Sequence, residues 1–532
     1  MIRWSKCPRS ILPRHPRLGW SVASAVILTC MTCATGAAQV NMRDARAHYE
    51  AGIRAFNRGE MDLAKTEFSA AIKIQPDFVE PRQNLAVTLA RQGDLDAAET
   101  EFRKVLALRP RSAEAHYNLG LVLLSKHNEG SALQQFQQAV SLNPDYPEAR
   151  NNLGLLLEEK GDIARAVVEF RAAVRLQPDF AEARNNLAHV LMSQDDLDAA
   201  IRECREALRL RPDFPEAHEN LGTALWKKHD LDGAEAEFRA AVALGRSEAW
   251  IPLGVVLGEK GELDAAIAAH RKAVELLPQD AEAHCLLGGG LQKRGDLDGA
   301  LAEFREAMSL DPKLADAHLN FGVAVRQTGD LPAAANALRV AASLAPNEPE
   351  VHYQLGLTLR RQGQLNEALA ELRRALALKP RYTEALYNLG NTLEAMGQHA
   401  QAQAAFAEVA RWQKQDADYA QAVTQYNLGL QTLAKGDLQS AGDAFRSALM
   451  IKPDFAEAHA NLGGVLLREG ETVNAIGQLR AAIDLKPDDA RAYYDLSLAL
   501  EKLGDARGAD EARRHASELD PHLLAPEPPS AR

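Results

Sequence analysis

The chain has 532 residues, of which 46% are apolar, 25% are charged and only 5% are aromatic. This composition excludes a globally disordered chain, and the scarcity of aromatic residues favours closely packed helices with a core of Ala and Leu over a β-sandwich. The formal net charge is −12, and the first 38 residues carry five basic groups and no acid, so the rest of the chain carries about −17. So acidic a body is a poor general binder of nucleic-acid phosphates.

Residues 1–38 have the pattern of a secretory signal peptide. Basic residues are followed by an uncharged stretch from Leu18 to Met42, and the small residues Gly36 and Ala38 would stand at −3 and −1 of a cleavage site. An uncleaved N-terminal membrane anchor and a wrongly assigned start codon are the alternatives. We therefore expect an exported protein, periplasmic or secreted, or one tethered to a membrane, with residues 39–44 as a short linker.

Of the five cysteines, three lie in the leader, at positions 7, 30 and 33. The Cys30–Cys33 pair has the spacing of a redox or metal site, but it lies in the apolar stretch, so we do not expect it to bind metal. Cys204 and Cys285 are the only cysteines of the body, which excludes a disulfide framework. We expect no metal and no cofactor.

The body is built from one repeated unit of about 34 residues. Prolines recur at 76, 110, 144, 178 and 212, and again at 278, 312, 346 and 380. With this proline as the thirty-second residue, fourteen copies begin at residues 45, 79, 113, 147, 181, 215, 247, 281, 315, 349, 383, 422, 456 and 490. A period of this length is typical of solenoid proteins.

Several positions of the copy are nearly constant. Position 8 is Gly in eleven copies and Ala or Ser in the others, position 20 is Ala in all fourteen, and position 27 is Ala in twelve. Small residues at fixed points allow two helices to approach closely, and Leu at position 7 with Phe at position 24 would fill the space between them. Gly at position 15 and Asp at position 16 predict the end of one helix and the cap of the next.

This pattern resembles the tetratricopeptide repeat (TPR) family, over residues 45–523. The resemblance implies an all-α fold, an α-solenoid in the form of a right-handed superhelix of about 14 TPR helix pairs. It also implies that the first helices line a concave surface and that the protein binds other proteins or peptides.

Two copies depart from the regular length. Copy six lacks the proline and has 32 residues, and copy eleven has 39. We expect joints there, which would divide the array into residues 45–246, 247–421 and 422–523, unless the loops absorb the length changes. A Pro-rich, flexible tail follows at 524–532.

Position 6 carries an amide in most copies and forms the predicted peptide-binding row. Its members are Asn84, Asn118, Asn152, Asn186, Asn220, Asn320, Gln354, Asn388, Asn427 and Asn461. An amide can donate to a backbone carbonyl and accept from a backbone N–H, so it suits an extended guest of any sequence. The row resembles the asparagine ladder in the TPR half of O-GlcNAc transferases, whose catalytic half has no room in this chain. The alternative is that these amides serve packing.

Two further positions have a structural and a functional interpretation. Position 2 is acidic in eleven copies, either to bind basic guests or to compensate the helix dipole. Position 4 is His in seven copies, and we expect packing there because neighbouring copies are too far apart to share a metal ion.

The sequence carries no familiar catalytic motif, so we do not expect an enzyme. The predicted function is a non-catalytic scaffold that binds extended peptide or protein partners in an exported or envelope-associated complex. The alternative is a substrate-recruiting or regulatory subunit of a separately encoded enzyme. Position 5 is never Lys or Arg, which argues against an Hsp90-type partner with an acidic C-terminus.

Overall fold

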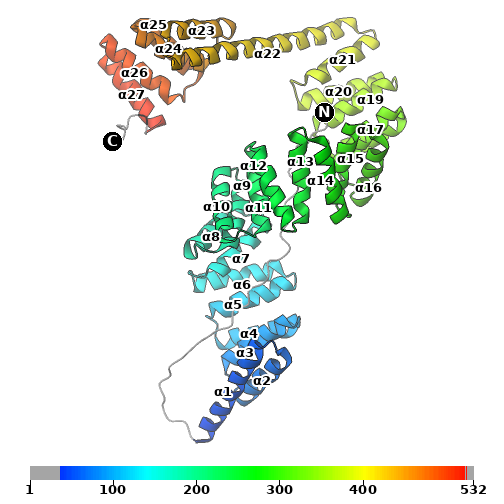
Figure 1. Cartoon of the computed structure of the whole chain (residues 1–532), viewed down its shortest axis with the longest axis vertical. Helices are drawn as coiled ribbons and strands as arrows, with labels where there is room; N and C mark the ends of the chain where they lie inside the picture. Colours follow the sequence, from blue (N-terminus) through cyan, green and yellow to red (C-terminus); the bar gives the residue numbers. More distant parts are fainter. Residues whose placement is uncertain (1–35, 522, 524–532) are drawn as a thin grey trace. The chain divides into compact units, whose positions relative to one another are not determined.

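The computed structural model describes residues 36–521 and residue 523. Within these residues the chain forms 27 α-helices and one 3-10 helix and has no strand (Figure 1). The all-α prediction is confirmed. Residues 1–35 of the predicted signal peptide and the predicted tail at 524–532 lie outside the described residues. In the described part of the chain, no helix has the length and apolar character that a membrane span requires.

The chain divides into two compact units, Met1–Ala324 and Val325–Arg532. The helices of the first unit are α1 (Gly36–Asn57), α2 (Met61–Ile74), α3 (Val79–Arg91), α4 (Leu95–Leu108), α5 (Ala113–Ser125), α6 (Glu129–Leu142), α7 (Pro147–Glu159), α8 (Ile163–Leu176), α9 (Ala181–Ser193), α10 (Leu197–Leu210), α11 (Pro215–Lys227), α12 (Leu231–Ala243), η1 (Ser247–Ala249), α13 (Trp250–Glu259), α14 (Leu263–Leu276), α15 (Ala281–Arg294) and α16 (Leu297–Leu310).

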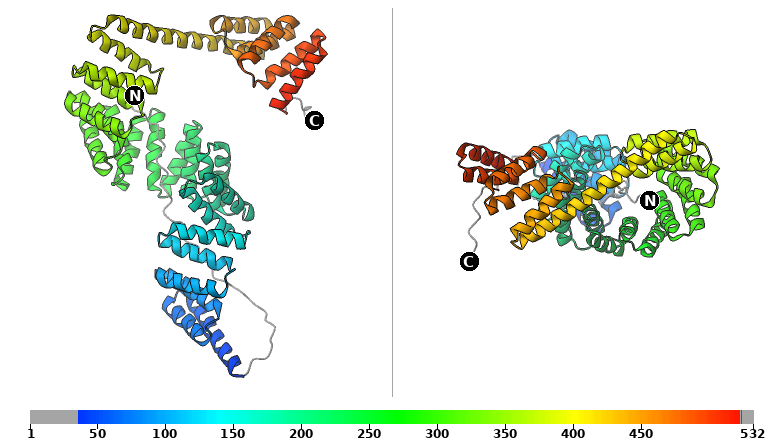
Figure 2. Two further views of the ribbon diagram at one scale, coloured as in Figure 1. Left: turned by 180° about the vertical axis from the view of Figure 1, so that it is seen from behind. Right: turned by 90° about the horizontal axis from the view of Figure 1, so that it is seen from above.

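The boundary between the units falls inside α17 (Ala315–Thr328). The second unit continues with α18 (Leu331–Leu344), α19 (Pro349–Arg361), α20 (Leu365–Leu378), α21 (Thr383–Ala395), α22 (His399–Ala434), α23 (Leu438–Ile451), α24 (Ala456–Glu469), α25 (Thr472–Leu485), α26 (Ala490–Leu503) and α27 (Ala506–Leu519). Within each unit, consecutive helices pack against each other as antiparallel pairs (Figure 2).

The turn inside each pair is set by position 15, as predicted. Its glycines have positive φ angles, for example 84° at Gly93 and 77° at Gly161. In copies three, five and six, His127, Asp195 and His229 take the same left-handed conformation without being glycine. The left-handed residue ends the first helix, and in most copies the following Asp or Asn accepts a hydrogen bond from the first turn of the second helix, as Asp94 does from the amide of Ala97 at 3.2 Å.

The two helices of a pair meet where position 8 faces position 24. Phe136 is fully buried, and a Cβ atom added at Gly120 would lie 2.6 Å from its Cε1 atom. The same close approach joins Gly154 to Phe170 and Gly222 to Phe238. The prediction that small and aromatic residues share this space is therefore confirmed.

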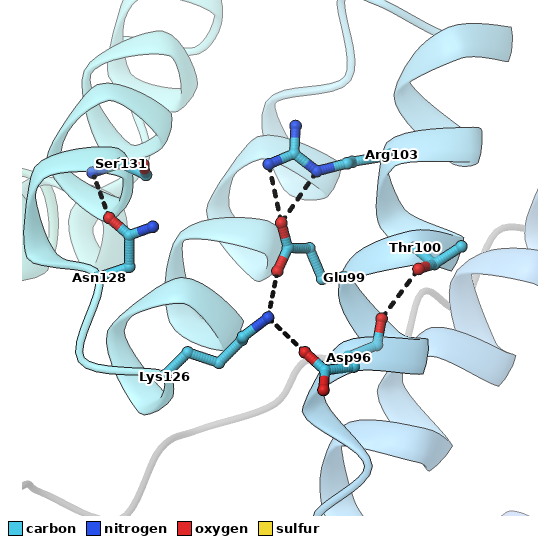
Figure 3. A network of polar contacts seen from close by, with 7 residues as sticks. All are labelled: Asp96, Glu99, Thr100, Arg103, Lys126, Asn128 and Ser131. Atoms are coloured by element: carbon cyan, nitrogen blue, oxygen red, sulfur yellow. Dashed lines mark hydrogen bonds and ion pairs between the residues drawn. The ribbon is translucent and has the colours of Figure 1, made fainter.

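Polar contacts also join neighbouring copies along the array. Figure 3 shows Lys126 of copy three between two carboxylates of copy two, with its Nζ atom 2.5 Å from Oδ1 of Asp96 and 2.7 Å from Oε2 of Glu99. Hydrogen bonds from Lys126 and Arg103 lower the pKa of Glu99 below its usual range. Lys260 makes the equivalent pair of contacts with Asp232 and Glu235 at 2.6 Å each, between copies seven and six. These contacts join the second helix of one copy to the C-terminal end of the first helix in the next copy.

The irregular segments have distinct structures. Residues 39–44, which we expected to form a linker, lie within α1. Around residue 246 a short 3-10 turn replaces the usual loop, and one hydrophobic core extends from Ala55 to Ala269 across this point. Around residue 421 there is no loop, because α22 runs without interruption through the end of copy eleven and the start of copy twelve. The bending of the array at these places stays a prediction.

Candidate functional site: the asparagine ladder

The amides of position 6 contact the preceding copy. In copy five, Nδ2 of Asn186 donates to Oδ1 of Asn151 at 3.0 Å, and in copy six Nδ2 of Asn220 donates to Oδ1 of Asn185 at 2.9 Å. Each acceptor is at position 5 of the preceding copy, 35 residues earlier in the sequence. We call this series of contacts the asparagine ladder, and each donor–acceptor pair a rung.

The same rung recurs at five further places along the chain. The remaining rungs are Asn84 to Tyr49 at 3.4 Å, Asn152 to Tyr117 at 3.2 Å, Asn320 to Sγ of Cys285 at 3.6 Å, Asn388 to Tyr353 at 3.4 Å and Asn461 to Tyr426 at 3.1 Å. The ladder therefore has a structural role, as one of the two interpretations predicted. Each rung uses the Nδ2 atom of the amide as a donor and does not involve its Oδ1 atom. The Oδ1 atoms of Asn152, Asn186 and Asn220 accept no hydrogen bond from another described residue, so they can accept one from a guest.

Three of the predicted residues form no such rung. Asn118 is completely buried, and neither its Nδ2 nor its Oδ1 atom has a hydrogen-bond partner among the described residues. The amide nitrogen of Gln83, at position 5 of the preceding copy, is buried and unpaired in the same part of the structure. Asn427 is exposed, and the described residues provide it with no hydrogen bond. Gln354 is part of a different network.

Gln354 binds a half-buried arginine of the preceding copy. Its Oε1 atom accepts a hydrogen bond from Arg326 at 2.6 Å, and its Nε2 atom donates to Oε1 of Glu350 at 2.7 Å. Tyr382 donates to the other carboxylate oxygen of Glu350. Burial lowers the pKa of Arg326, and the nearby charge of Arg361 lowers it further. The sequence contains the glutamine of this network at a predictable position but gives no sign of its arginine partner.

Tyr117 shows how a tyrosine of the ladder is fixed by both a ring contact and a hydrogen bond. Tyr117 is 4% exposed, packs against the tilted ring of Tyr146 with ring centroids 4.9 Å apart, and accepts a hydrogen bond from Asn152. Burial and the nearby carboxylate of Glu148 raise the pKa of Tyr117 well above its usual range, so its hydroxyl stays protonated. The acceptor of this rung is therefore neutral.

Acidic side chains flank the ladder on the same helix faces, four residues before nine of the ten amides; Val423 precedes Asn427. Some of them are paired within their own copy: Glu80 with Arg109 at 2.8 Å and Glu182 with Arg211 at 2.6 Å. Glu114, Glu148 and Glu216 are partly or fully exposed and form no ion pair with another described residue. These three carboxylates add negative charge beside the ladder of the first unit.

The histidines of position 4 connect their own second helix to the preceding copy. In copy eight, Nδ1 of His284 lies 2.7 Å from Oε2 of Glu303, and Nε2 lies 3.2 Å from the carbonyl oxygen of Pro278. Arg150 makes the same two contacts in copy four, with Glu169 and with the carbonyl oxygen of Pro144. The position therefore serves packing between copies, as predicted. No group of His, Cys, Asp and Glu in the described part of the chain has an arrangement that could hold a metal ion.

Sequence reasoning identified the amide row but missed its acceptors. The acceptors at position 5 are Tyr, Asn or Cys, and other copies carry Gln, Glu, Ile, Leu or Ala there, so no single residue type marks the position. The available signal was the constant separation of 35 residues between an acceptor-bearing side chain and the following amide.

Comparison with protein-family models gives repeated matches to one family, described as "Tetratricopeptide repeat" or "TPR repeat". The matches cover residues 84–147, 130–179, 151–215, 185–249, 219–281, 291–355, 356–397, 383–416, 426–490 and 490–523. Among curated proteins, none matches this sequence significantly.

Several solved structures have similar folds. The APC/C hetero-tetramer Cut9–Hcn1 has 17% sequence identity over 87% of this chain and 98% of that chain, with a TM-score of 0.37. The PilF protein of Pseudomonas aeruginosa has 20% identity over 38% of this chain and 94% of that chain, with a TM-score of 0.35. MamA, residues 41 to the end, from Desulfovibrio magneticus RS-1 has 25% identity over 32% of this chain and 96% of that chain, with a TM-score of 0.30.

Proposed function

The chain belongs to the tetratricopeptide repeat family, and we propose that it is a non-catalytic scaffold that binds extended protein segments along the asparagine ladder. Repeats of this family generally mediate protein–protein interactions. The observation that supports the ladder as the binding surface is the set of free amide oxygens beside it. They lie on successive first helices, at half-buried positions that ordered rungs hold in place.

The geometry of the rungs suggests how such a guest would bind. Neighbouring helices pack at about 10 Å, and an extended chain advances about 3.3 Å per residue, so roughly every third backbone N–H of a guest would meet an Oδ1 atom. Each bond would contribute about 0.5–1.5 kcal/mol, so several in a row are needed to offset the cost of ordering the guest.

The charge of the ladder face favours a neutral or basic guest. Glu114, Glu148 and Glu216 form no ion pair with another described residue, and the surrounding body is acidic. A strongly acidic segment would meet like charges and lose affinity. We further propose, from the leader pattern, that the scaffold acts in the cell envelope or outside the cell.

The test uses the full-length tagged protein, crosslinked in its native cells and analysed by mass spectrometry. In one variant Glu114, Glu148 and Glu216 are changed to Gln, which keeps the shape of the ladder face and removes its charge. The control variant changes Asp264, Asp298 and Glu306, which are exposed on second helices, to their amides. Partners should be lost or reduced in the first variant only; equal loss or equal retention in both would contradict the proposal.

A second variant tests the amides themselves. Asn152, Asn186 and Asn220 are changed to Ala, and unchanged helicity is verified by circular dichroism. A scaffold predicts loss of its partners, whereas a recruiting subunit would in addition retain one stable enzyme partner whose substrate range changes. Retention of all partners would place the binding surface elsewhere.

A further inference from the structure

The helix α22 replaces the loop that separates neighbouring copies in the rest of the described chain. It has 36 residues, whereas α21 before it has 13 and α23 after it has 14. The reason is local: Lys414 is at the position where all but one of the preceding copies carry proline, and there is no Gly or Pro between residues 398 and 428. Nothing in this stretch stops helix propagation.

The continuous helix interrupts the hydrophobic core. One core cluster of the second unit extends from Leu369 to Val409, with Trp412 at its edge. The next cluster begins at Ala422 and involves α23 and the residues that follow. In the first unit, by contrast, a single cluster continues through seven copies. The last face of copy eleven and the first face of copy twelve therefore lack the neighbour that other copies have.

One rung of the ladder is missing at the same place. Before this point Tyr353 accepts a hydrogen bond from Asn388 at 3.4 Å, and after it Tyr426 accepts one from Asn461 at 3.1 Å. The pair between them would be Tyr387 and Asn427. Tyr387 is 52% exposed, whereas Tyr117 at the same position is 4% exposed.

Apolar side chains are also left uncovered on this face. Leu428 is 46% exposed, whereas every other leucine at position 7 is buried, with an exposed fraction between 1% and 9%. Leu430 is 37% exposed, and Leu121 at the same position of copy three is completely buried. The residues that normally form the interface between two copies are present here, but they face solvent.

We propose that two copies of this chain pair reciprocally around α22, so that copy twelve of each stacks on copy eleven of the other. In this arrangement Asn427 and Leu428 of one chain contact Tyr387 and its surroundings in the second chain. Within one chain the helix prevents the contact, because 36 residues at 1.5 Å per residue hold its ends about 54 Å apart.

The partner is a second copy because this chain carries both halves of the missing interface. The donor Asn427, the acceptor Tyr387 and the uncovered Leu428 are at the repeat positions that form the contact between neighbouring copies elsewhere in the chain. If each chain stacks its copy twelve on copy eleven of the other, the dimer is closed by a twofold axis, as in domain swapping. Neither of the two repeat faces is then left exposed. A different protein would have to reproduce both faces of a repeat.

The first test is the mass of the purified full-length chain in solution, measured by light scattering after size exclusion. We expect twice the chain mass for the wild type. Leu428→Asp should have the mass of one chain with unchanged helicity. Val473→Asp is the matched control, since Val473 is 70% exposed on α25, outside the proposed interface, and this variant should remain dimeric.

The second test locates the contact and does not depend on a disruptive variant. A photo-crosslinking amino acid replaces Leu428, and chains with natural and heavy nitrogen are mixed and refolded together before irradiation. We expect crosslinks between light and heavy peptides that contain Tyr387. A wild-type monomer, a dimer that persists in Leu428→Asp, or crosslinks to Tyr387 confined to one chain would each overturn the proposal; the last would mean that α22 breaks and copy twelve folds back.

Discussion

Asn186 donates a hydrogen bond of 3.0 Å to Asn151, which is 35 residues earlier and 5% exposed. The bond joins two first helices of successive copies and satisfies the oxygen of a buried amide. It makes the asparagine row a connection between repeats as well as a candidate surface for guests.

The rung predicts unequal effects of two substitutions at the same repeat position. Asn186→Leu leaves the oxygen of Asn151 buried without a donor, so we expect it to destabilise the first unit by about 1–3 kcal/mol. Asn118→Leu removes an amide that has no partner among the described residues, so it should be neutral or stabilising. Thermal unfolding of both variants, followed by circular dichroism, tests the difference; equal losses would show that Asn118 is satisfied in solution, for instance by water.

The histidine of position 4 should be replaceable by arginine. His284 contacts Glu303 and the carbonyl oxygen of Pro278, and Arg150 makes the same contacts in its own copy. We therefore expect His284→Arg to retain stability, whereas His284→Leu should cost about 1–3 kcal/mol because it removes the imidazole that contacts these acceptors. The midpoints of urea unfolding distinguish the two variants, and the interpretation fails if arginine is as damaging as leucine.

His270 should make the array sensitive to acid. It occupies position 24, where most copies carry Phe, and burial lowers its pKa to about 4, an effect that a backbone hydrogen bond with Ile251 partly offsets. The unfolded chain gains a proton on this side chain below about pH 6.5, and the folded chain does so only below about pH 4. Its contribution to stability is thus complete above pH 6.5 and is lost progressively towards pH 4, by on the order of 3 kcal/mol in all.

The control for this acid sensitivity is His270→Phe, which restores the residue type common at that position. The stability difference between the variant and the wild type should grow between pH 6.5 and pH 4 and then level off. Hydrogen exchange of α13 and α14 measures it locally, and a difference that does not change with pH would assign the acid sensitivity to other groups.

The two cysteines of the body should react only after unfolding. Cys204 and Cys285 are free and buried, and burial raises the pKa of the Cys285 thiol to about 12 and that of Cys204 further. Because the thiolate is the reactive form, labelling by a thiol reagent should be slow in the native protein and rapid in denaturant. With the leader cysteines replaced by serine, rapid labelling of native protein at either position would show local opening of α10 or α15.

The sequence by itself determined the helices, their pairing and most of the packing inside each pair. Gly at position 15 acts within a single turn, and the small residue at position 8 faces position 24 across one short loop. Such relationships connect residues close in the chain and therefore appear as a periodic pattern. The same reasoning located the row that begins with Asn84.

Only the tertiary structure decided what that row contacts and where the stacking stops. The acceptor of each amide belongs to another copy, 35 residues away, and its residue type varies, so no local rule reveals it. The hydrogen bond from Arg326 to Gln354 also joins two copies, and no local rule predicts it. The continuity of α22 depends on a missing proline that the sequence shows, but its consequence, the separation of Tyr387 from Asn427, follows from the rigid length of the helix.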